Sequence, residues 1–76
     1  MDISPAQCRA ARALLDITQD ELAEKSRVSK RTIAHFESGK RTPVPATLMA
    51  LKRAFEEDCI VFTETGVGVH LPKRTT

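Results

Sequence analysis

The spacing of hydrophobic residues changes once along this chain of 76 residues. Up to about residue 58, apolar residues recur every three or four positions, a spacing that indicates amphipathic helices. Beyond that point β-branched residues alternate with other residues, and this spacing of two indicates strands. The pattern predicts a mainly α fold of four helices followed by a C-terminal β-hairpin. We expect residues 1–58 to form the helical domain, residues 59–72 the hairpin and residues 73–76 a disordered basic tail.

Capping patterns mark the starts of the first two helices. Ser4 can cap the first helix, with a proline in the first turn and Gln7 returning a hydrogen bond to the cap. Thr18 and Glu21 repeat this exchange at the start of the second helix. Only a few residues separate that helix from the next cap, Ser29, and such a short connection is typical of a helix-turn-helix unit.

The third helix, after Ser29, is predicted to have two unlike faces. Ile33 and Phe36 fall on one side at 100° per residue, so we expect this side to pack against the core. The opposite side is polar and basic, and it carries Arg31, Ala34, His35 and Ser38, with Lys30 at its edge. A helix with an apolar back and a basic, hydrogen-bonding front suits entry into a DNA groove.

Glycine and proline punctuate the chain after the third helix. Gly39 is expected to end that helix, because glycine adopts a left-handed conformation at little cost. Two prolines then bias the connection toward extended geometry. A fourth helix is predicted over residues 45–57, where leucine and phenylalanine recur at spacings of three and four.

The last apolar segment predicts a hairpin with strands at residues 60–63 and 67–71. An isolated hairpin is marginally stable in water, so this one either covers the helices or pairs across a dimer axis. We expect it to serve as a dimerisation element. The side chains predicted to form the dimer interface lie on two faces: Ile60 and Phe62 on one, and Val67, Val69 and Leu71 on the other.

The distribution of charge says more than the net charge of +2. Between Lys25 and Arg41 there are six basic residues and one acidic residue, a local excess of five positive charges. Acidic residues gather elsewhere, at 16–24 and 56–58. Such asymmetry indicates one face that attracts a polyanion.

Other chemistry finds little support in the sequence. Cys8 and Cys59 match no metal-ligand spacing, and we expect reduced, packed thiols, with redox sensing as the alternative. We expect no metal, no cofactor and no enzymatic activity, because no nucleophile–histidine–acid arrangement or glycine-rich phosphate loop occurs. The chain shows no secretory signal pattern and no run of about 20 apolar residues, so we expect a soluble cytoplasmic protein.

The segment TQDELAEKSRVSKRTIAHFESGKRTP, residues 18–43, resembles the Xre/Cro-type helix-turn-helix domain of bacterial and phage repressors. The resemblance covers roughly residues 8–55. It implies a sequence-specific transcriptional regulator that binds double-stranded DNA, and we expect a homodimeric repressor that reads a near-palindromic operator. The alternative is a protein-interaction adaptor, of the antitoxin or anti-activator type, and an additional protein partner remains open.

The resemblance also implies roles for individual residues. Base-reading positions are Lys30, Arg31, Ala34 and His35. Phosphate-contacting positions are Gln19, Thr32, Ser38, Lys40 and Arg41. Gln19 is also implied to brace the third helix, and Arg12 and Glu37 correspond to a partly buried ion pair between the first and third helices.

One position departs from the family pattern. The turn of the family usually has glycine where this chain has Arg27. A positive φ at an arginine would cost roughly 1–2 kcal/mol. Either the turn differs from that of the family, or the strain is accepted because Arg27 reaches a phosphate.

Overall fold

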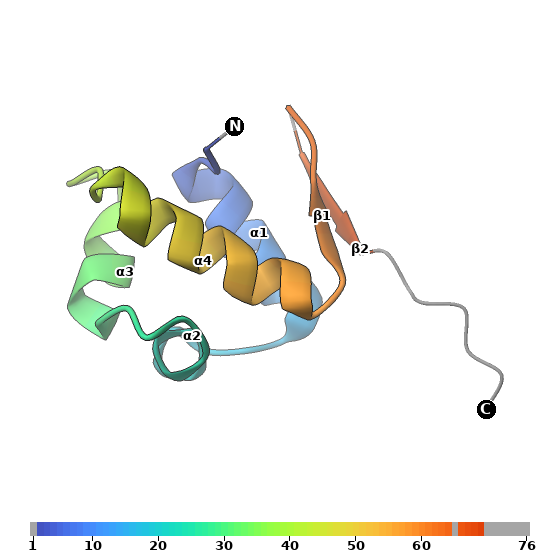
Figure 1. Cartoon of the computed structure of the whole chain (residues 1–76), viewed down its shortest axis with the longest axis horizontal. Helices are drawn as coiled ribbons and strands as arrows, with labels where there is room; N and C mark the ends of the chain where they lie inside the picture. Colours follow the sequence, from blue (N-terminus) through green and yellow to red (C-terminus); the bar gives the residue numbers. More distant parts are fainter. Residues whose placement is uncertain (1, 65, 70–76) are drawn as a thin grey trace, which may run out of the picture.

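Four helices and a two-stranded hairpin make up residues 2–64 and 66–69, which are the residues described by the computed structural model (Figure 1). The elements in chain order are α1 (Pro5–Leu15), α2 (Gln19–Ser26), α3 (Lys30–Glu37), α4 (Pro45–Glu57), β1 (Ile60–Phe62) and β2 (Val67–Val69). The mainly α fold predicted from the hydrophobic pattern is confirmed. The predicted interface residue Leu71 and the predicted tail at 73–76 lie outside the described residues.

The helix starts follow from local chemistry. At α1, Ser4 Oγ accepts a hydrogen bond from the Gln7 amide at 3.1 Å, and Gln7 Oε1 accepts one from the Ser4 amide at 2.8 Å. Thr18 and Glu21 make the same reciprocal pair at α2, at 3.1 and 2.9 Å. Both predicted capping boxes are therefore confirmed, and each satisfies amide groups that have no partner within the helix.

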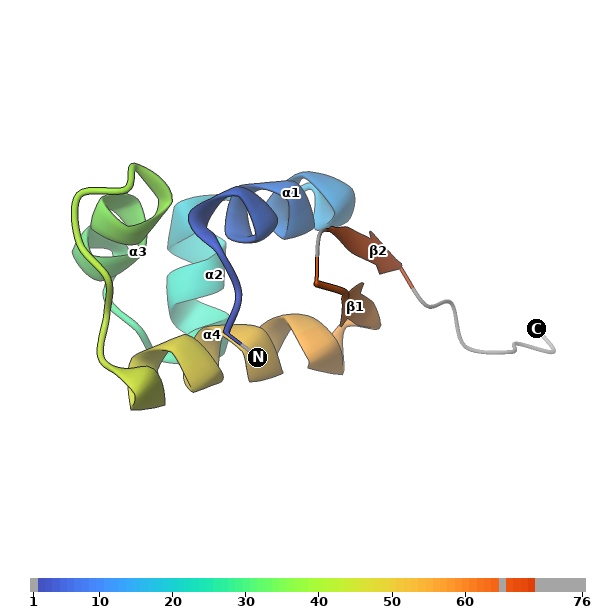
Figure 2. The ribbon, with the colours of Figure 1, turned by 90° about the horizontal axis from the view of Figure 1, so that it is seen from above.

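The helices surround a core of mostly aliphatic side chains. The largest fully buried side chains are Phe55, Leu22, Ile33, Leu51 and Cys8. Figure 2 shows α1 and α4 on opposite sides of the molecule, with α3 at one end, the hairpin at the other and α2 between them. The helix expected to read DNA and the hairpin therefore lie at opposite ends.

The hairpin packs on the helices of its own chain, which is one of the two arrangements that the sequence left open. Ile60 is 2% exposed, and the ring of Phe62 meets that of Phe55 edge to face, with centroids 5.9 Å apart. Phe62 and Val67 are both partly buried against the core. This packing supplies the surface that an isolated hairpin lacks.

The predicted division of the hairpin into two apolar faces is wrong. Phe62 pairs directly with Val67, and Ile60 pairs with Val69, in the antiparallel register. Directly opposite residues of an antiparallel pair lie on the same face of the sheet. The strand of residues 67–69 was assigned to the wrong face because the register depends on the length of the connecting turn, which alternation within each strand does not reveal.

The predicted dimerisation role of the hairpin stays a prediction, with one constraint from the structure. The side chain of Ile60 is already committed to the core of its own chain, so it would reach a partner only if the hairpin detached. On β1 the large apolar side chain that faces solvent is Val61, which is 46% exposed. A contact between folded copies through β1 would therefore involve Val61, which the sequence pattern had not singled out.

Gln7 has a second role that the capping pattern does not reveal. Its side chain is buried, and Nε2 donates to the backbone oxygens of Thr63 and Gly66 at 2.7 and 2.8 Å. The same turn is closed by the Gly66 amide, which donates to Thr63 Oγ1 at 2.9 Å. One side chain thus ties the start of α1 to the turn of the hairpin.

Candidate nucleic-acid interface

The turn between α2 and α3 contains a left-handed residue. Arg27 has φ 64° and ψ 23°, and its amide donates to the Ala23 oxygen at 2.9 Å. The strained backbone that the family pattern implies is therefore present, at a cost of roughly 1–2 kcal/mol. Ser26 supports the turn: its buried hydroxyl donates to the Leu22 oxygen at 2.7 Å and accepts from the Val28 amide at 3.2 Å.

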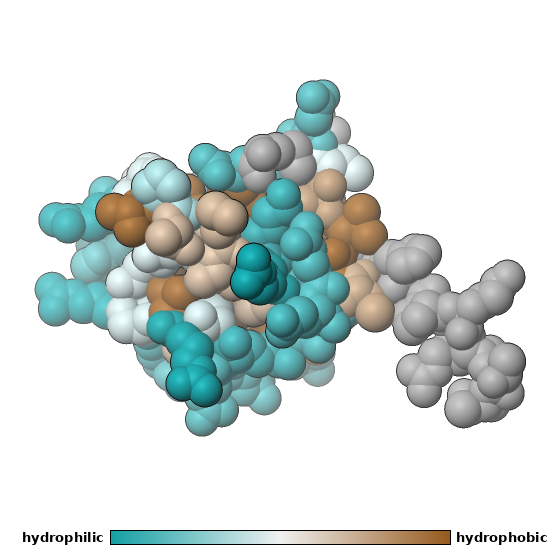
Figure 3. Space-filling view, in the orientation of Figure 1, coloured by the Kyte–Doolittle hydropathy of each residue, from teal (hydrophilic) through white to brown (hydrophobic). Residues whose placement is uncertain are grey.

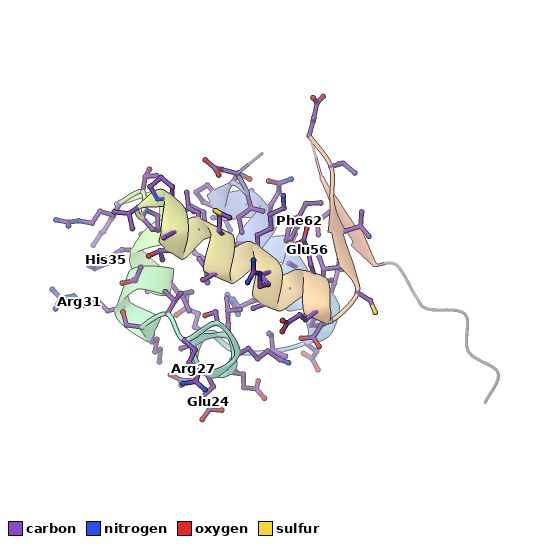
Figure 4. All side chains as sticks on the ribbon, in the orientation of Figure 1. Glu24, Arg27, Arg31, His35, Glu56 and Phe62 are labelled. Atoms are coloured by element: carbon purple, nitrogen blue, oxygen red, sulfur yellow. The ribbon has the colours of Figure 1, made fainter. Side chains whose placement is uncertain are left out.

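Helix α3 turns its apolar side inward and its basic side outward, as predicted. Ile33 and Phe36 are 0% and 3% exposed, and Ser29 Oγ caps the helix by accepting from the Thr32 amide at 3.2 Å. Figure 4 shows Arg31 projecting from α3 away from the body of the molecule, with His35 on the same helix. Beyond the helix, the predicted left-handed Gly39 has φ 81°.

Four of the predicted DNA contacts line one groove. The groove has a volume of about 260 Å³, and its lining residues are Arg31, Thr32, His35, Arg41 and Pro43. Arg31 and His35 come from the implied base-reading set, whereas Thr32 and Arg41 come from the implied phosphate set. The fold therefore places cationic and hydrogen-bonding groups of both kinds beside the outer face of α3.

The hydroxyl protons of Thr32 and Ser38 differ in their availability for a phosphate. Ser29 Oγ donates to Thr32 Oγ1 at 2.9 Å, which leaves the hydroxyl proton of Thr32 free to donate outward. Ser38 Oγ instead donates to the His35 oxygen at 3.0 Å, so its proton is already used. Because phosphate oxygens only accept hydrogen bonds, Thr32 is the better placed of the two hydroxyls.

The remaining implied contacts are more dispersed. Lys30 Nζ lies 3.3 Å from Asp20 Oδ1, and both side chains are well exposed, so this ion pair is weak and phosphate can displace it. Lys40 is exposed just beyond α3. Arg27 caps the C-terminal end of α2, and Figure 4 shows it on the α2 side of the molecule, apart from Arg31.

The back of α3 is fixed by a buried carboxylate. Glu37 is 4% exposed, and its Oε1 accepts from Arg12 Nη2 at 2.8 Å and from Gln19 Nε2 at 3.0 Å. Its Oε2 accepts from Arg12 Nε at 2.8 Å and from Cys8 Sγ at 3.1 Å. The ion pair implied by the resemblance is therefore present in a bidentate form, which is the strongest geometry for arginine and carboxylate.

Gln19 can brace α3 and contact DNA at the same time. Its amide nitrogen carries two protons, and the bond to Glu37 uses one of them. The second proton remains for a phosphate oxygen.

Two further contacts were not foreseen from the sequence: the thiol of Cys8 on Glu37, and the guanidinium of Arg9, whose Nη1 donates to the backbone oxygen of Glu37.

The electrostatics of this cluster favour a charged Glu37 and a neutral Cys8. Burial acts to raise the pKa of Glu37, but hydrogen bonds from Arg12, Gln19 and Cys8, with the charge of Arg12, outweigh it and lower that pKa below its ordinary value. Burial raises the pKa of Cys8 far above its ordinary value, and the hydrogen bond and charge of Glu37 add to the effect.

The model of the helix-turn-helix family matches residues 9–59 of the chain, about two-thirds of its length. The chain belongs to the Xre/Cro-type helix-turn-helix family. This membership identifies it as a DNA-binding transcription regulator, in a family of regulators rather than of enzymes. The match ends at residue 59, so the hairpin lies beyond it. A search of the curated proteins found no matching relative.

The large exposed apolar side chains of this helix-turn-helix protein lie away from α2 and α3 in the described part of the chain. Figure 3 shows hydrophilic side chains over the α2 side, the outer edge at α3 and the C-terminal half of α4, and apolar patches near the start of α4 and on the hairpin. The exposed large apolar side chains are Leu14, Val44, Met49 and Val61. None of them lies on α2 or α3. Within the described residues, no helix has the length and apolar character needed to cross a membrane.

Proposed function

We propose that this helix-turn-helix protein is a homodimeric repressor that reads a near-palindromic operator through α3. The observation that carries the proposal is a groove beside α3. Arg31, Thr32 and His35 of the helix line it together with Arg41 from the connection that follows, and the opposite side of α3 is fixed to α1 and α2 through Glu37. To discriminate between sequences, a protein must hold its base-contacting side chains on a rigid element.

In this mechanism each residue type has a chemical task. The guanidinium of Arg31 grips the two major-groove acceptors of guanine, an interaction worth about 1–3 kcal/mol of discrimination. Thr32 and Arg41 hold backbone phosphates, which fix the register of α3 without reading sequence. The second amide proton of Gln19 provides a further phosphate contact, and Lys40 adds attraction that weakens with salt.

Dimerisation and repression complete the proposal. Two subunits place their α3 helices in successive major grooves, at half-sites about one helical turn, or 34–36 Å, apart. Occupation of promoter DNA by the dimer then blocks transcription.

The test is selection of bound sequences from a random duplex pool by the intact protein, with light scattering to measure its oligomeric state. The proposal expects an enriched site with two inverted halves and a dimer bound to it. Equal binding to all duplexes, or an enriched site without inverted halves, would contradict it. A parallel selection without protein, with the pool sequenced before and after it, corrects for amplification bias.

A protein-interaction adaptor is the second candidate, and a specific surface favours it. A groove of about 400 Å³ between α2 and α4 is lined by four apolar and four polar or charged residues: Ala46, Met49, Ala50 and Ala54, with Lys25, Ser26, Arg53 and Glu57. Met49 in this lining is 59% exposed. Binding of a fluorescent random duplex at low and at moderate salt separates the two candidates. Absence of binding even at low salt would favour the adaptor, because the non-specific attraction of a DNA-binding face persists there.

A further inference from the structure

Glu37 lies where α1, α2 and α3 meet, and its carboxylate is fully hydrogen bonded. Each oxygen accepts two hydrogen bonds: Arg12 and Gln19 donate to Oε1, and Arg12 and Cys8 donate to Oε2. An ionised carboxylate offers about four acceptor positions. The thiol of Cys8 therefore fills the last one.

We propose that Cys8 is a positioning residue for DNA recognition, whose thiol proton completes the hydrogen bonding of Glu37 and so fixes how α3 presents its outer face. This inference rests on the proposed function of α3 as the reader of DNA. It assigns to Cys8 a role in the alignment of a helix, distinct from the packing of an apolar core position.

The neutral thiol, rather than the thiolate, suits this position. Cys8 is completely buried, its Sγ lies 3.1 Å from Glu37 Oε2, and that carboxylate carries a negative charge. A thiolate there would place two like charges in contact in a buried environment, and it would lack the proton that makes the bond. Burial and Glu37 both raise the pKa of the thiol, which keeps it protonated.

Glu37 links the Cys8 contact to the outer face of α3, which carries Arg31 and His35. Glu37 is the last residue of α3, and residues of α1 bind both its side chain and its backbone. Arg12 and Cys8 donate to the carboxylate, and Arg9 donates to the backbone oxygen. His35 lies two residues earlier, on the wall of the groove. If Oε2 loses the thiol, one acceptor position of a buried carboxylate is left unsatisfied, and the carboxylate can relieve this only by readjusting together with the end of α3 that carries it.

The test compares Cys8→Ala with Cys8→Ser in the full chain. Alanine and serine have nearly the same size, so the pair differs chiefly in a hydroxyl that can donate to Glu37. Cys59→Ala is the matched control, because it removes the other thiol at a half-buried position after α4. Each variant is measured at a temperature where circular dichroism shows it to be folded.

The first measurement is affinity for the duplex selected by the wild-type protein and for a random duplex. We expect Cys8→Ala to bind the selected duplex about tenfold more weakly, because binding must then restore the α3 geometry that the thiol holds in the wild type, at a cost comparable to one hydrogen bond. Cys8→Ser and Cys59→Ala should bind it as the wild type does, and random duplex should bind all variants alike. Equal weakening by alanine and serine, or wild-type binding by Cys8→Ala, would overturn the inference.

The second measurement needs no DNA, so it separates failure of this inference from failure of the proposed function. Amide NMR spectra and a titration of the Glu37 carboxyl are recorded for the same variants. Cys8→Ala should shift the α3 amide signals and raise the pKa of Glu37, and Cys8→Ser should restore both. Unchanged α3 signals and an unchanged Glu37 pKa in Cys8→Ala would refute the positioning role, whether or not the wild type selects a sequence.

Discussion

Replacement of Arg12 by methionine tests the buried cluster behind α3. Methionine keeps much of the apolar stem of arginine but removes both hydrogen bonds to Glu37, which then remains as a carboxylate only 4% exposed. Breaking a buried ion pair on one side costs about 3–5 kcal/mol. Gln19 and Cys8 still donate to Glu37, and Arg12 itself is 22% exposed, so we expect the lower end, about 3 kcal/mol.

Urea unfolding at pH 7, followed by circular dichroism, measures this loss. For a domain of this size an m-value near 1 kcal/mol/M is reasonable, so the midpoint should fall by roughly 3 M. The double variant Arg12→Met/Glu37→Gln should recover much of the loss, because it removes the uncompensated charge as well. Arg9→Met is the control on the same helix, since Arg9 contacts only the backbone oxygen of Glu37 among the described contacts.

The stability difference between Arg12→Met and the wild type should depend on pH, and the direction of that dependence tests the role of Glu37. In the wild type the folded pKa of Glu37 is below 4.5, so its contribution to stability is complete above pH 4.5 and is lost as pH falls through the folded value. Without Arg12 the burial of Glu37 still disfavours its charged form, so the pKa of Glu37 should rise and the carboxylate should take up a proton more readily. The stability gap between Arg12→Met and the wild type should therefore narrow from pH 7 to pH 4. A gap that is constant over this range, or a double variant no more stable than Arg12→Met, would show that the unpaired charge of Glu37 is not what destabilises Arg12→Met.

Three further predictions concern other parts of the molecule. Lys40→Ala should weaken binding to all duplexes and reduce the slope of log affinity against log salt by about one, whereas an unchanged slope would count against a phosphate contact. Gln7→Ala should destabilise the hairpin by about 1–3 kcal/mol, because the Thr63 oxygen loses the donor that Gln7 supplies and the Gly66 oxygen keeps only the Thr63 amide; hydrogen exchange at residues 60–69 measures this, and unchanged protection would disprove the tie. Cys59 should react with a thiol reagent at pH 8 much faster than Cys8, because burial and a raised pKa suppress the Cys8 thiolate; similar rates would contradict the buried hydrogen bond.

The parts of the fold that local chemistry determines could be predicted from the sequence. Ser4 and Gln7, or Thr18 and Glu21, lie three residues apart, so their capping exchange needs no knowledge of the rest of the chain. The inward and outward faces of α3 follow from helical spacing alone. The left-handed residue of the turn was implied by the family pattern, although its arginine left the geometry open until the structure gave φ 64°.

The parts that depend on tertiary contacts could not be predicted. The faces of the hairpin depend on a register set by the turn, so alternation within each strand gave the wrong grouping of Phe62 and Val67. Cys8 sits at an apolar position of α1 and meets Glu37, 29 residues away, and no local pattern marks a thiol as a hydrogen-bond donor. Gln7 was recognised as half of a cap, but its donors reach a turn 56 residues further on.

The most direct test of α3 as the reader is to repeat selection from the random duplex pool with Arg31→Ala and compare the result with the wild-type site. Arg31 projects outward from α3 and lines the groove beside it, and in the proposed mechanism its guanidinium binds a guanine. It predicts that Arg31→Ala loses preference at one base pair, symmetrically in both half-sites, while the other enriched positions persist. An identical enriched sequence from both proteins would contradict the reading of DNA bases by the Arg31 side of α3.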